Sequence, residues 1–139
     1  MHSKQKGDIG EASVIKSLLM SGYPVFTEFG DLSKIDVITI VDTKLVRIQV
    51  KNFASQPNAG CFCLSIRKNG PGYRYVYTES DVDVFACYIA AKDCVVYIGW
   101  KDLQLQNQLH IRYEPSKNGN AKLVHWYEDF LSIENALTK

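Results

Sequence analysis

Four polar side chains with the chemistry of a hydrolytic site lie in the N-terminal part of the sequence. Asp36 interrupts the apolar segment KIDVITIV, and Gln49 and Lys51 interrupt LVRIQVKN, a second strand-like segment. Glu11 precedes both segments, in a stretch with helical periodicity. Carboxylate and amide oxygens are the donors that Mg²⁺ prefers, and a lysine can stabilise charge on a phosphate. These residue types therefore indicate metal-assisted hydrolysis of a phosphodiester.

A tight turn between the two segments would bring three of these side chains onto one face. We expect strands over Ile35–Val41 and Leu45–Asn52, joined by a two-residue turn at Asp42-Thr43. In that register Asp36 lies directly opposite Gln49, and the lysine two positions further shares their face because strand side chains alternate. The opposite face would hold the core residues Val46, Ile48 and Val50. A slip of one residue would invert all of these assignments.

The helix that carries Glu11 must point it at the same face. A helix is expected over Asp8–Gly22, with Asp8 as its N-terminal cap and Gly22 as its end. Glu11 would lie on its apolar side, next to Val14 and Leu18, at about 100° per residue. A carboxylate that faces a core requires a cation, hydrogen bonds or a metal ion. If the helix packs on the sheet, Glu11 joins the oxygen donors of the hairpin.

Each of these residues also has a purely structural interpretation. Asp8 and Glu11 have the spacing of a capping box, in which the glutamate only bonds back to the helix start. Asp36 could be an acid at a strand edge or turn, and Gln49 and Lys51 could lie on a solvated strand face. One hairpin register and one helix orientation decide among these alternatives together.

The rest of the pattern indicates a single α/β domain over residues 1–139. The breaker cluster Asn69-Gly70-Pro71-Gly72 is expected to form a mobile loop. After Lys101 the pattern weakens, and we expect a turn at Asn118-Gly119-Asn120 and a closing helix over Trp126–Leu137. Four more strands are expected at Tyr23–Phe29, Cys61–Arg67, Val84–Ala90 and Cys94–Gly99.

The composition is that of an ordinary soluble globular domain, with 46% hydrophobic and 22% charged residues. The longest apolar run is shorter than the roughly 18 residues of a membrane span, and no apolar segment follows MHSKQK. We therefore expect a cytoplasmic protein without membrane contact. The four cysteines lack the CxxC spacing of a zinc site, so core packing is expected for them. His110 and His125 lack metal-ligand spacing and are expected to be structural or surface residues.

The near-neutral net charge of +1 conceals an uneven distribution. Residues 1–74 hold ten Lys/Arg and six Asp/Glu, giving +4, and no carboxylate occurs between Thr43 and Thr78. Such a basic region is typical of a surface that binds a polyanion, although an exposed hairpin with solubilising lysines would show the same pattern. Tyr77 is a weaker candidate, since one face of its segment could be core. The candidate DNA contacts are Lys44, Arg47, Arg67, Lys68, Tyr73, Arg74 and Tyr75.

The motifs GDIGE, KID and IQVK together resemble the PD-(D/E)XK nuclease superfamily. The segment YRYVYTESDVDVFACYI, residues 73–89, is similar to the branch that contains an intron-encoded homing endonuclease of cyanobacteria, which also has a glutamine at the usual acidic position. The resemblance covers roughly residues 6–100 and leaves 101–139 as a C-terminal extension without a match. It implies a restriction-endonuclease-like core, in which a central mixed β-sheet is flanked by helices.

The resemblance also implies an activity and its residues. Glu11, Asp36, Gln49 and Lys51 would form the active site, with Mg²⁺ held by the two carboxylates and the backbone carbonyl of Val50, and Mn²⁺ able to substitute. The enzyme would be a site-specific homing endonuclease that cuts double-stranded DNA as a homo-oligomer, a dimer or a tetramer, since each subunit cuts one strand. Apolar residues of the two strands after residue 84 could supply the interface.

Two departures from the family pattern are visible. Ile35 replaces the proline of the motif, which carries no catalytic group, and Gln49 replaces a carboxylate, which removes one negative charge and should weaken metal binding. The alternatives are a nuclease related to Holliday-junction resolvases or restriction enzymes, a catalytically inactive DNA-binding module of the same fold, and a protein-interaction domain.

Overall fold

The computed structural model of the protein describes residues 2–52, 60–115 and 125–138. No helix in these ranges is long and apolar enough to cross a membrane. The helical elements are α1 (Ser3–Met20), η1 (Ala90–Lys92), α2 (Trp100–Leu103), η2 (Tyr127–Phe130) and α3 (Ile133–Leu137). The strands are β1 (Val37–Val41), β2 (Lys44–Asn52), β3 (Cys61–Ser65), β4 (Arg67–Gly70), β5 (Tyr73–Val76), β6 (Val84–Ile89), β7 (Cys94–Gly99) and β8 (Gln108–Arg112).

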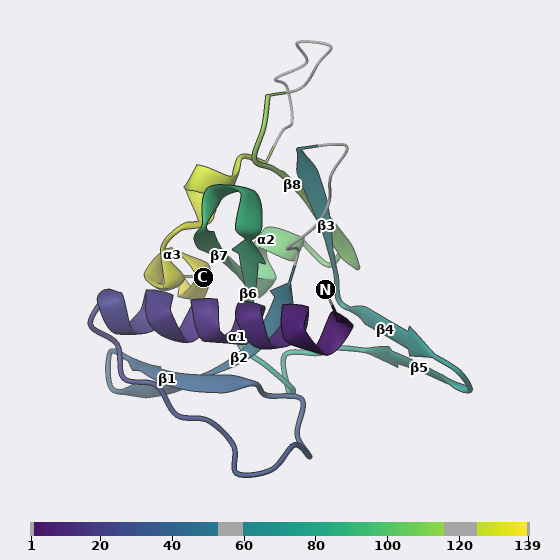
Figure 1. The fold of residues 1–139 in the computed structure, drawn as a ribbon, viewed down its shortest axis with the longest axis horizontal. Helices are drawn as coiled ribbons and strands as arrows, with labels where there is room; N and C mark the ends of the chain where they lie inside the picture. Colours follow the sequence, from purple (N-terminus) through teal and green to yellow (C-terminus); the bar gives the residue numbers. More distant parts are fainter. Residues whose placement is uncertain (1, 53–59, 116–124, 139) are drawn as a thin grey trace.

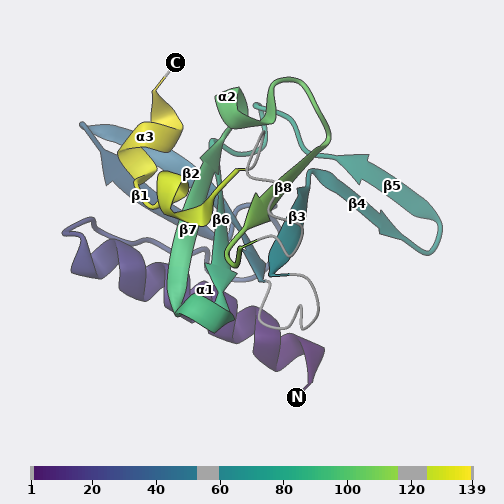
Figure 2. The ribbon, with the colours of Figure 1, turned by 90° about the horizontal axis from the view of Figure 1, so that it is seen from above.

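A four-stranded mixed sheet with the order β1-β2-β6-β7 forms the centre of the molecule. Strands β1 and β2 are antiparallel, β2 and β6 are parallel, and β6 and β7 are antiparallel. Helix α1 crosses one face of this sheet, and β3 and β8 form a separate two-stranded sheet on the far side of β6 and β7 (Figures 1 and 2). The predicted α/β architecture with a mixed central sheet is confirmed.

Helix α1 packs on the sheet through one apolar stripe. Val14 and Leu18 are buried against β1, β2 and β6, together with residues of β7 and α3. Helix α3 approaches β7 so closely that a Cβ atom on Gly99 would lie 1.8 Å from the carbonyl oxygen of Ala136. Only glycine fits at that contact, which fixes the C-terminal segment to the end of the sheet.

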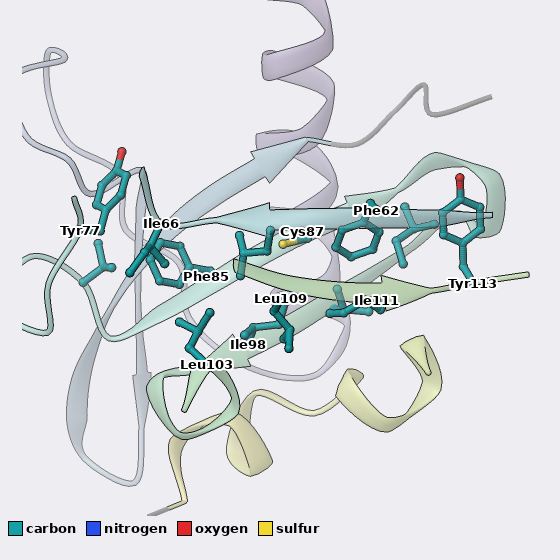
Figure 3. Packing of buried hydrophobic residues seen from close by; sticks show 14 residues of the cluster. Phe62, Ile66, Tyr77, Phe85, Cys87, Ile98, Leu103, Leu109, Ile111 and Tyr113 are labelled. Atoms are coloured by element: carbon teal, nitrogen blue, oxygen red, sulfur yellow. The ribbon is translucent and has the colours of Figure 1, made fainter. Parts of the chain in front are cut away.

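The opposite face of β6 and β7 forms the larger core cluster (Figure 3). Phe85, Cys87 and Ile98 project from the central sheet onto Phe62 and Ile111 of the β3–β8 sheet. Because both faces of β6 and β7 are covered, the sequences of these strands are continuous apolar runs. Their residues are therefore core residues, and the expectation that they supply an exposed interface is wrong.

The β1–β2 hairpin has the predicted register. Asp42 and Thr43 form the two-residue turn with φ angles of 50° and 68°, the left-handed conformation of a type I′ turn. Val41 pairs with Lys44, and Val37 with Ile48. The core-facing and pocket-facing sides of the hairpin are thereby fixed as the sequence predicts.

Four predicted boundaries are corrected by the structure. Helix α1 begins at Ser3, with the His2 side chain accepting a hydrogen bond from the Lys4 N–H, so Asp8 is not its cap. The segment 23–29 contributes only an isolated bridge between Phe26 and Ile38 instead of a strand. The predicted loop at 69–72 is the tip of the β4–β5 hairpin, where Pro71 and Gly72, with φ of 79° at the glycine, form the turn.

The predicted closing helix over 126–137 is divided into η2 and α3 by Leu131 and Ser132. Ser132 caps α3 by accepting a hydrogen bond from the Asn135 N–H. The turn predicted at 118–120 lies outside the described residues. All four cysteines are free, with Cys87 fully buried.

Candidate active site

Asp36 lies immediately before β1 and is held against β2 by two hydrogen bonds. Its backbone N–H donates to the Ile48 carbonyl at 2.9 Å, and its Oδ2 accepts from the Val50 N–H at 2.9 Å. Gln49 lies beside it on the same face, with Nε2 donating to the Val50 carbonyl oxygen at 3.3 Å. The carboxylate is thus fixed in orientation by the backbone of the neighbouring strand.

Burial dominates the electrostatics of Asp36. It raises the pKa of the carboxyl, the Val50 hydrogen bond partly offsets that rise, and the charge of Asp31 adds to it. Lys51 and Lys68 act in the opposite direction because they are the nearby cations. The site therefore holds an anionic group that needs additional positive charge.

Lys51 extends from β2 on the same side as Gln49. Its Nζ lies 4.9 Å from the centre of the Tyr77 ring, within the range of a cation–π contact. Burial is the main cause that lowers the pKa of Lys51, and Lys68 lowers it further, while Asp36 acts to raise it. The ammonium is partly withdrawn from water, which strengthens its interaction with a bound anion.

Glu11 lies in the interior of α1, more than one turn beyond the helix start at Ser3. The capping box of this helix is formed by His2 and Gln5, so the capping interpretation of Glu11 is wrong. In the part of the chain that the structure describes, the partly buried Glu11 side chain has no hydrogen bond or ion pair. Its pKa is raised by burial first and then by Asp36 and other acids. The charge of Asp36 therefore acts directly on Glu11.

A pocket of about 460 Å³ opens at this face of the hairpin. Asp36 and Gln49 form one wall, the loop 31–34 forms a second, and the β4–β5 hairpin forms the third. From that hairpin come Lys68, Tyr73 and Tyr75, and Tyr77 follows it. The pocket thus joins two of the predicted catalytic residues, Asp36 and Gln49, to a basic and aromatic surface, whereas Glu11 and Lys51 are not among its lining residues.

The aromatic wall is anchored to the core. Tyr75 and Tyr77 meet edge to face at 5.5 Å between ring centroids, and Tyr77 meets Phe85 in the same way at 5.7 Å. The Tyr75 hydroxyl donates to Asp81 at 2.6 Å, and Lys34 Nζ lies 3.9 Å from the centre of the Tyr75 ring. These contacts fix the base of the β4–β5 hairpin beside Asp36 and Gln49.

Not every predicted DNA contact lies near this pocket. Lys44 lies at the exposed turn end of β2, far along the strand from Gln49. Arg47 is engaged within the protein, where its guanidinium binds both Asp83 oxygens at 2.9 and 3.1 Å and the carbonyl oxygens of Glu79 and Ser80. Arg67, Lys68, Tyr73 and Arg74 are exposed on β4 and β5, whereas Tyr75 is half-buried.

Two pocket residues could not be identified from the sequence. Asp31 contributes charge to both candidate carboxylates, and Lys34 covers Tyr75. Both lie in an irregular loop, where no periodicity predicts the direction of a side chain. The signal that could have found them is their closeness in sequence to Asp36. His110 is exposed on β8, and the His125 ring packs against Phe130.

The oxygen donors fit a divalent cation. Among the described residues, no three His, Cys, Asp or Glu side chains gather as a metal-binding group. Asp31 and Asp36 line the pocket, and the charge of Asp36 acts on Glu11, so neutral oxygens and water would complete any metal site here. The Gln49 amide and the Val50 carbonyl adjoin Asp36 and are such oxygens. This all-oxygen set, with both carboxyl pKa values raised, matches the preference of Mg²⁺.

A comparison with protein-family models assigns the chain to a family. The model described as "PD-(D/E)XK endonuclease" matches residues 1–133. The chain belongs to the PD-(D/E)XK endonuclease family. The predicted superfamily is therefore confirmed. The match includes most of the C-terminal segment that the sequence resemblance left unassigned.

The fold of this PD-(D/E)XK endonuclease is shared with a solved structure. It is similar to a bacterial homing endonuclease, I-Ssp6803I, with a TM-score of 0.71 and 21% identity over 88% of this chain and 86% of the other. At this level of identity the likeness shows the fold alone. No curated protein matches the sequence.

Proposed function

We propose that the protein is a metal-dependent endonuclease that hydrolyses phosphodiester bonds in double-stranded DNA at a specific site, as a homing endonuclease does. The observation that supports this proposal is that Asp36 and Gln49 line a pocket with a basic and aromatic wall. Glu11 and Lys51 do not line that pocket, but the charge of Asp36 acts on the pKa of each of them. Membership of an endonuclease family supports the reaction, and the fold shared with a homing endonuclease supports the biological role.

Each residue has a distinct role in the proposed reaction. Glu11, Asp36, the Gln49 amide oxygen and the Val50 carbonyl would hold Mg²⁺, and Mn²⁺ could substitute. When bound, such a cation polarises the scissile phosphate and acidifies water. Lys51, supported by the Tyr77 ring, stabilises the negative charge that develops on the phosphate. The expected products carry a 5′-phosphate and a 3′-hydroxyl.

The experiment compares two lysines of the same strand. Lys51→Ala removes the ammonium beside the Tyr77 ring, and Lys44→Ala removes an exposed ammonium at the far end of β2. With plasmid DNA, Mg²⁺ and saturating protein, we expect the Lys51 variant to lose about 10²–10³-fold in cleavage rate. The Lys44 variant, which lacks at most one DNA contact, should cleave at the parent's rate once binding is saturated. Addition of EDTA should abolish cleavage by the parent protein.

A catalytically inactive DNA-binding module is the second candidate, because Gln49 stands where the family pattern has a carboxylate. Gln49 supplies no charge, and its Nε2 already donates to the Val50 carbonyl. In that case the parent protein would bind DNA in a salt-dependent manner but would not cleave it with either Mg²⁺ or Mn²⁺. A nuclease specific for branched junctions would instead prefer a four-way junction to a linear duplex in the same assay.

A further inference from the structure

The β4–β5 hairpin is a two-stranded ribbon that extends away from the body of the protein in both views (Figures 1 and 2). Its register pairs Arg67 with Val76, Lys68 with Tyr75, Asn69 with Arg74, and Gly70 with Tyr73. At about 3.3 Å per residue, four pairs span roughly 10–13 Å. The major groove of DNA is about 12 Å wide and 8.5 Å deep and admits such a ribbon.

One face of the ribbon is directed into the candidate active-site pocket. Lys68 and its partner Tyr75 line this pocket, and so does Tyr73, the partner of Gly70. The Tyr73 ring lies directly over Gly70, where a Cβ atom would be 2.2 Å from it. The charge of Lys68 reaches both Asp36 and Lys51. This face is therefore suited to the phosphate that is to be cut.

The other face of the ribbon is directed away from the pocket. Because cross-strand partners and alternate residues share a side, it carries Asn69 beside Arg74, and Arg67 beside Val76. All four residues are exposed. Arg67, at the base, lies against Asn107, with guanidinium nitrogens at 2.7 and 3.2 Å from the amide oxygen when that amide faces it.

The Asn69 and Arg74 side chains are not engaged by other residues that the structure describes. In the ranges that the structure describes, neither side chain has a hydrogen bond or an ion pair. An arginine binds the guanine edge through two hydrogen bonds, and an asparagine binds the adenine edge in the same way. Residues 44–77 contain no carboxylate that would repel DNA. Donors placed side by side on a rigid ribbon thus match neighbouring base edges in the groove.

We propose that the β4–β5 ribbon enters the major groove, where Asn69 and Arg74 read base edges, while Lys68 on the opposite face holds the backbone phosphate at the active site. This proposal rests on the proposed DNA endonuclease function and deepens it, because it separates the residues that determine the target sequence from those that position the scissile bond.

The test is a selection of bound duplexes from a randomised DNA library, with Ca²⁺ in place of Mg²⁺, for the parent protein and for four variants. For Asn69→Ala and Arg74→Ala, we expect a loss of preference of about 10- to 100-fold at one or two base positions, and little change elsewhere. For Lys68→Ala, we expect weaker binding to all sequences and a salt dependence reduced by about one counterion. Thermal melts should show that all variants fold.

Arg74→Lys is the decisive control, because it keeps the charge and removes the two-pronged hydrogen bonding. If Arg74 reads a base, the lysine variant loses the preference while the salt dependence of its binding stays unchanged. If Arg74→Lys binds with the parent's sequence preference, or if the parent shows no preference, the proposal is overturned. Cleavage is measured separately with Mg²⁺, so a failure of the nuclease function is distinguished from a failure of base reading.

Discussion

Glu11 is a candidate site residue whose partial burial lowers the free energy of unfolding. A partly buried carboxylate without a hydrogen bond or ion pair, as Glu11 is among the described residues, is unfavourable for folding. Burial and the charge of Asp36 both raise the pKa of Glu11, so the folded state binds its proton more tightly than the unfolded chain. By linkage, this residue lowers the free energy of unfolding as the pH rises.

Replacement of Glu11 by glutamine should therefore stabilise the metal-free protein at neutral pH. As the pH falls below the ordinary value of 4.5, Glu11 becomes protonated in the unfolded chain as well as in the folded protein, and the two stabilities should converge. Urea unfolding in EDTA between pH 4 and pH 8 measures the difference, which should grow with pH. The same variant should lose at least about 100-fold in Mg²⁺-dependent cleavage. A variant less stable than the parent at pH 7 would contradict this account.

The predictability of the site follows from which residues lie in regular structure. The alternation of β2 and the two-residue turn were enough to place Gln49 and Lys51 on the side of Asp36. A shift of the pairing by one residue would turn these side chains to the other face, and the length of the turn excludes that shift. Asp31 and Lys34 were not predictable, since they lie in a loop. The bonding of Arg47 to Asp83 was not predictable either, because the two residues are distant in sequence.

At the scale of elements, the Arg47–Asp83 pair determines how β2 is joined to β6. The Asp83 N–H donates to the Arg47 carbonyl at 2.8 Å, and the Asp83 carboxylate accepts from the Arg47 N–H at 2.8 Å and from its guanidinium. This contact lies directly before the parallel pairing of Ile48 with Val84. It therefore helps to hold the register that positions Lys51.

We predict that Asp83→Asn lowers the free energy of unfolding at pH 7 by about 1 kcal/mol, because it removes a partly exposed ion pair but keeps an acceptor. Burial acts to raise the pKa of Asp83, but the hydrogen bonds from Arg47 outweigh it, so the net shift is downward. The stabilisation is therefore present above the ordinary value of 3.8 and disappears as the pH falls through the lowered pKa. Denaturant titrations at several pH values measure it, with Glu79→Gln, an exposed acid of the same loop, as the control.

Strands were predicted well from the sequence where one apolar run continued through the element. Helix starts and turns were predicted poorly where cap-like or turn-like residues occurred inside an element. Strands β2, β6 and β7 follow their apolar runs to within a residue. The start of α1 was misplaced because Asp8 and Glu11 imitate a capping box. The loop predicted at 69–72 is shorter in the structure, because Asn69 and Gly70 continue β4 and only Pro71 and Gly72 form the turn to β5.

At the scale of the whole molecule, one chain presents one candidate site, whereas a duplex has two strands of opposite polarity. A double-strand break therefore requires either two subunits or two successive binding events. The faces of strands β6 and β7 are covered by core residues, so their side chains do not supply an exposed apolar interface. Large apolar side chains are instead exposed at Phe29 and Leu32, in the loop before β1, and at Leu45 of β2, where they retain 105%, 97% and 66% of their accessible surface. Leu32 lines the candidate pocket, whereas Leu45 does not, so Leu45 is the exposed apolar side chain chosen to test a contact between subunits.

We predict that the protein acts on its target as a homo-oligomer, a dimer or a tetramer. Sedimentation velocity with and without a target duplex should give a complex that contains at least two chains per duplex. Supercoiled plasmid should pass to the linear form with little accumulation of nicked circles, because two sites would cut within one binding event. Leu45→Glu should shift the protein to the monomer and make nicked circles the main product, since a charge in an apolar interface is costly. Lys44→Ala, at the neighbouring exposed position, is the matched control. A parent protein that sediments as a monomer on DNA, and only nicks it, would exclude paired subunits as the source of double-strand cleavage.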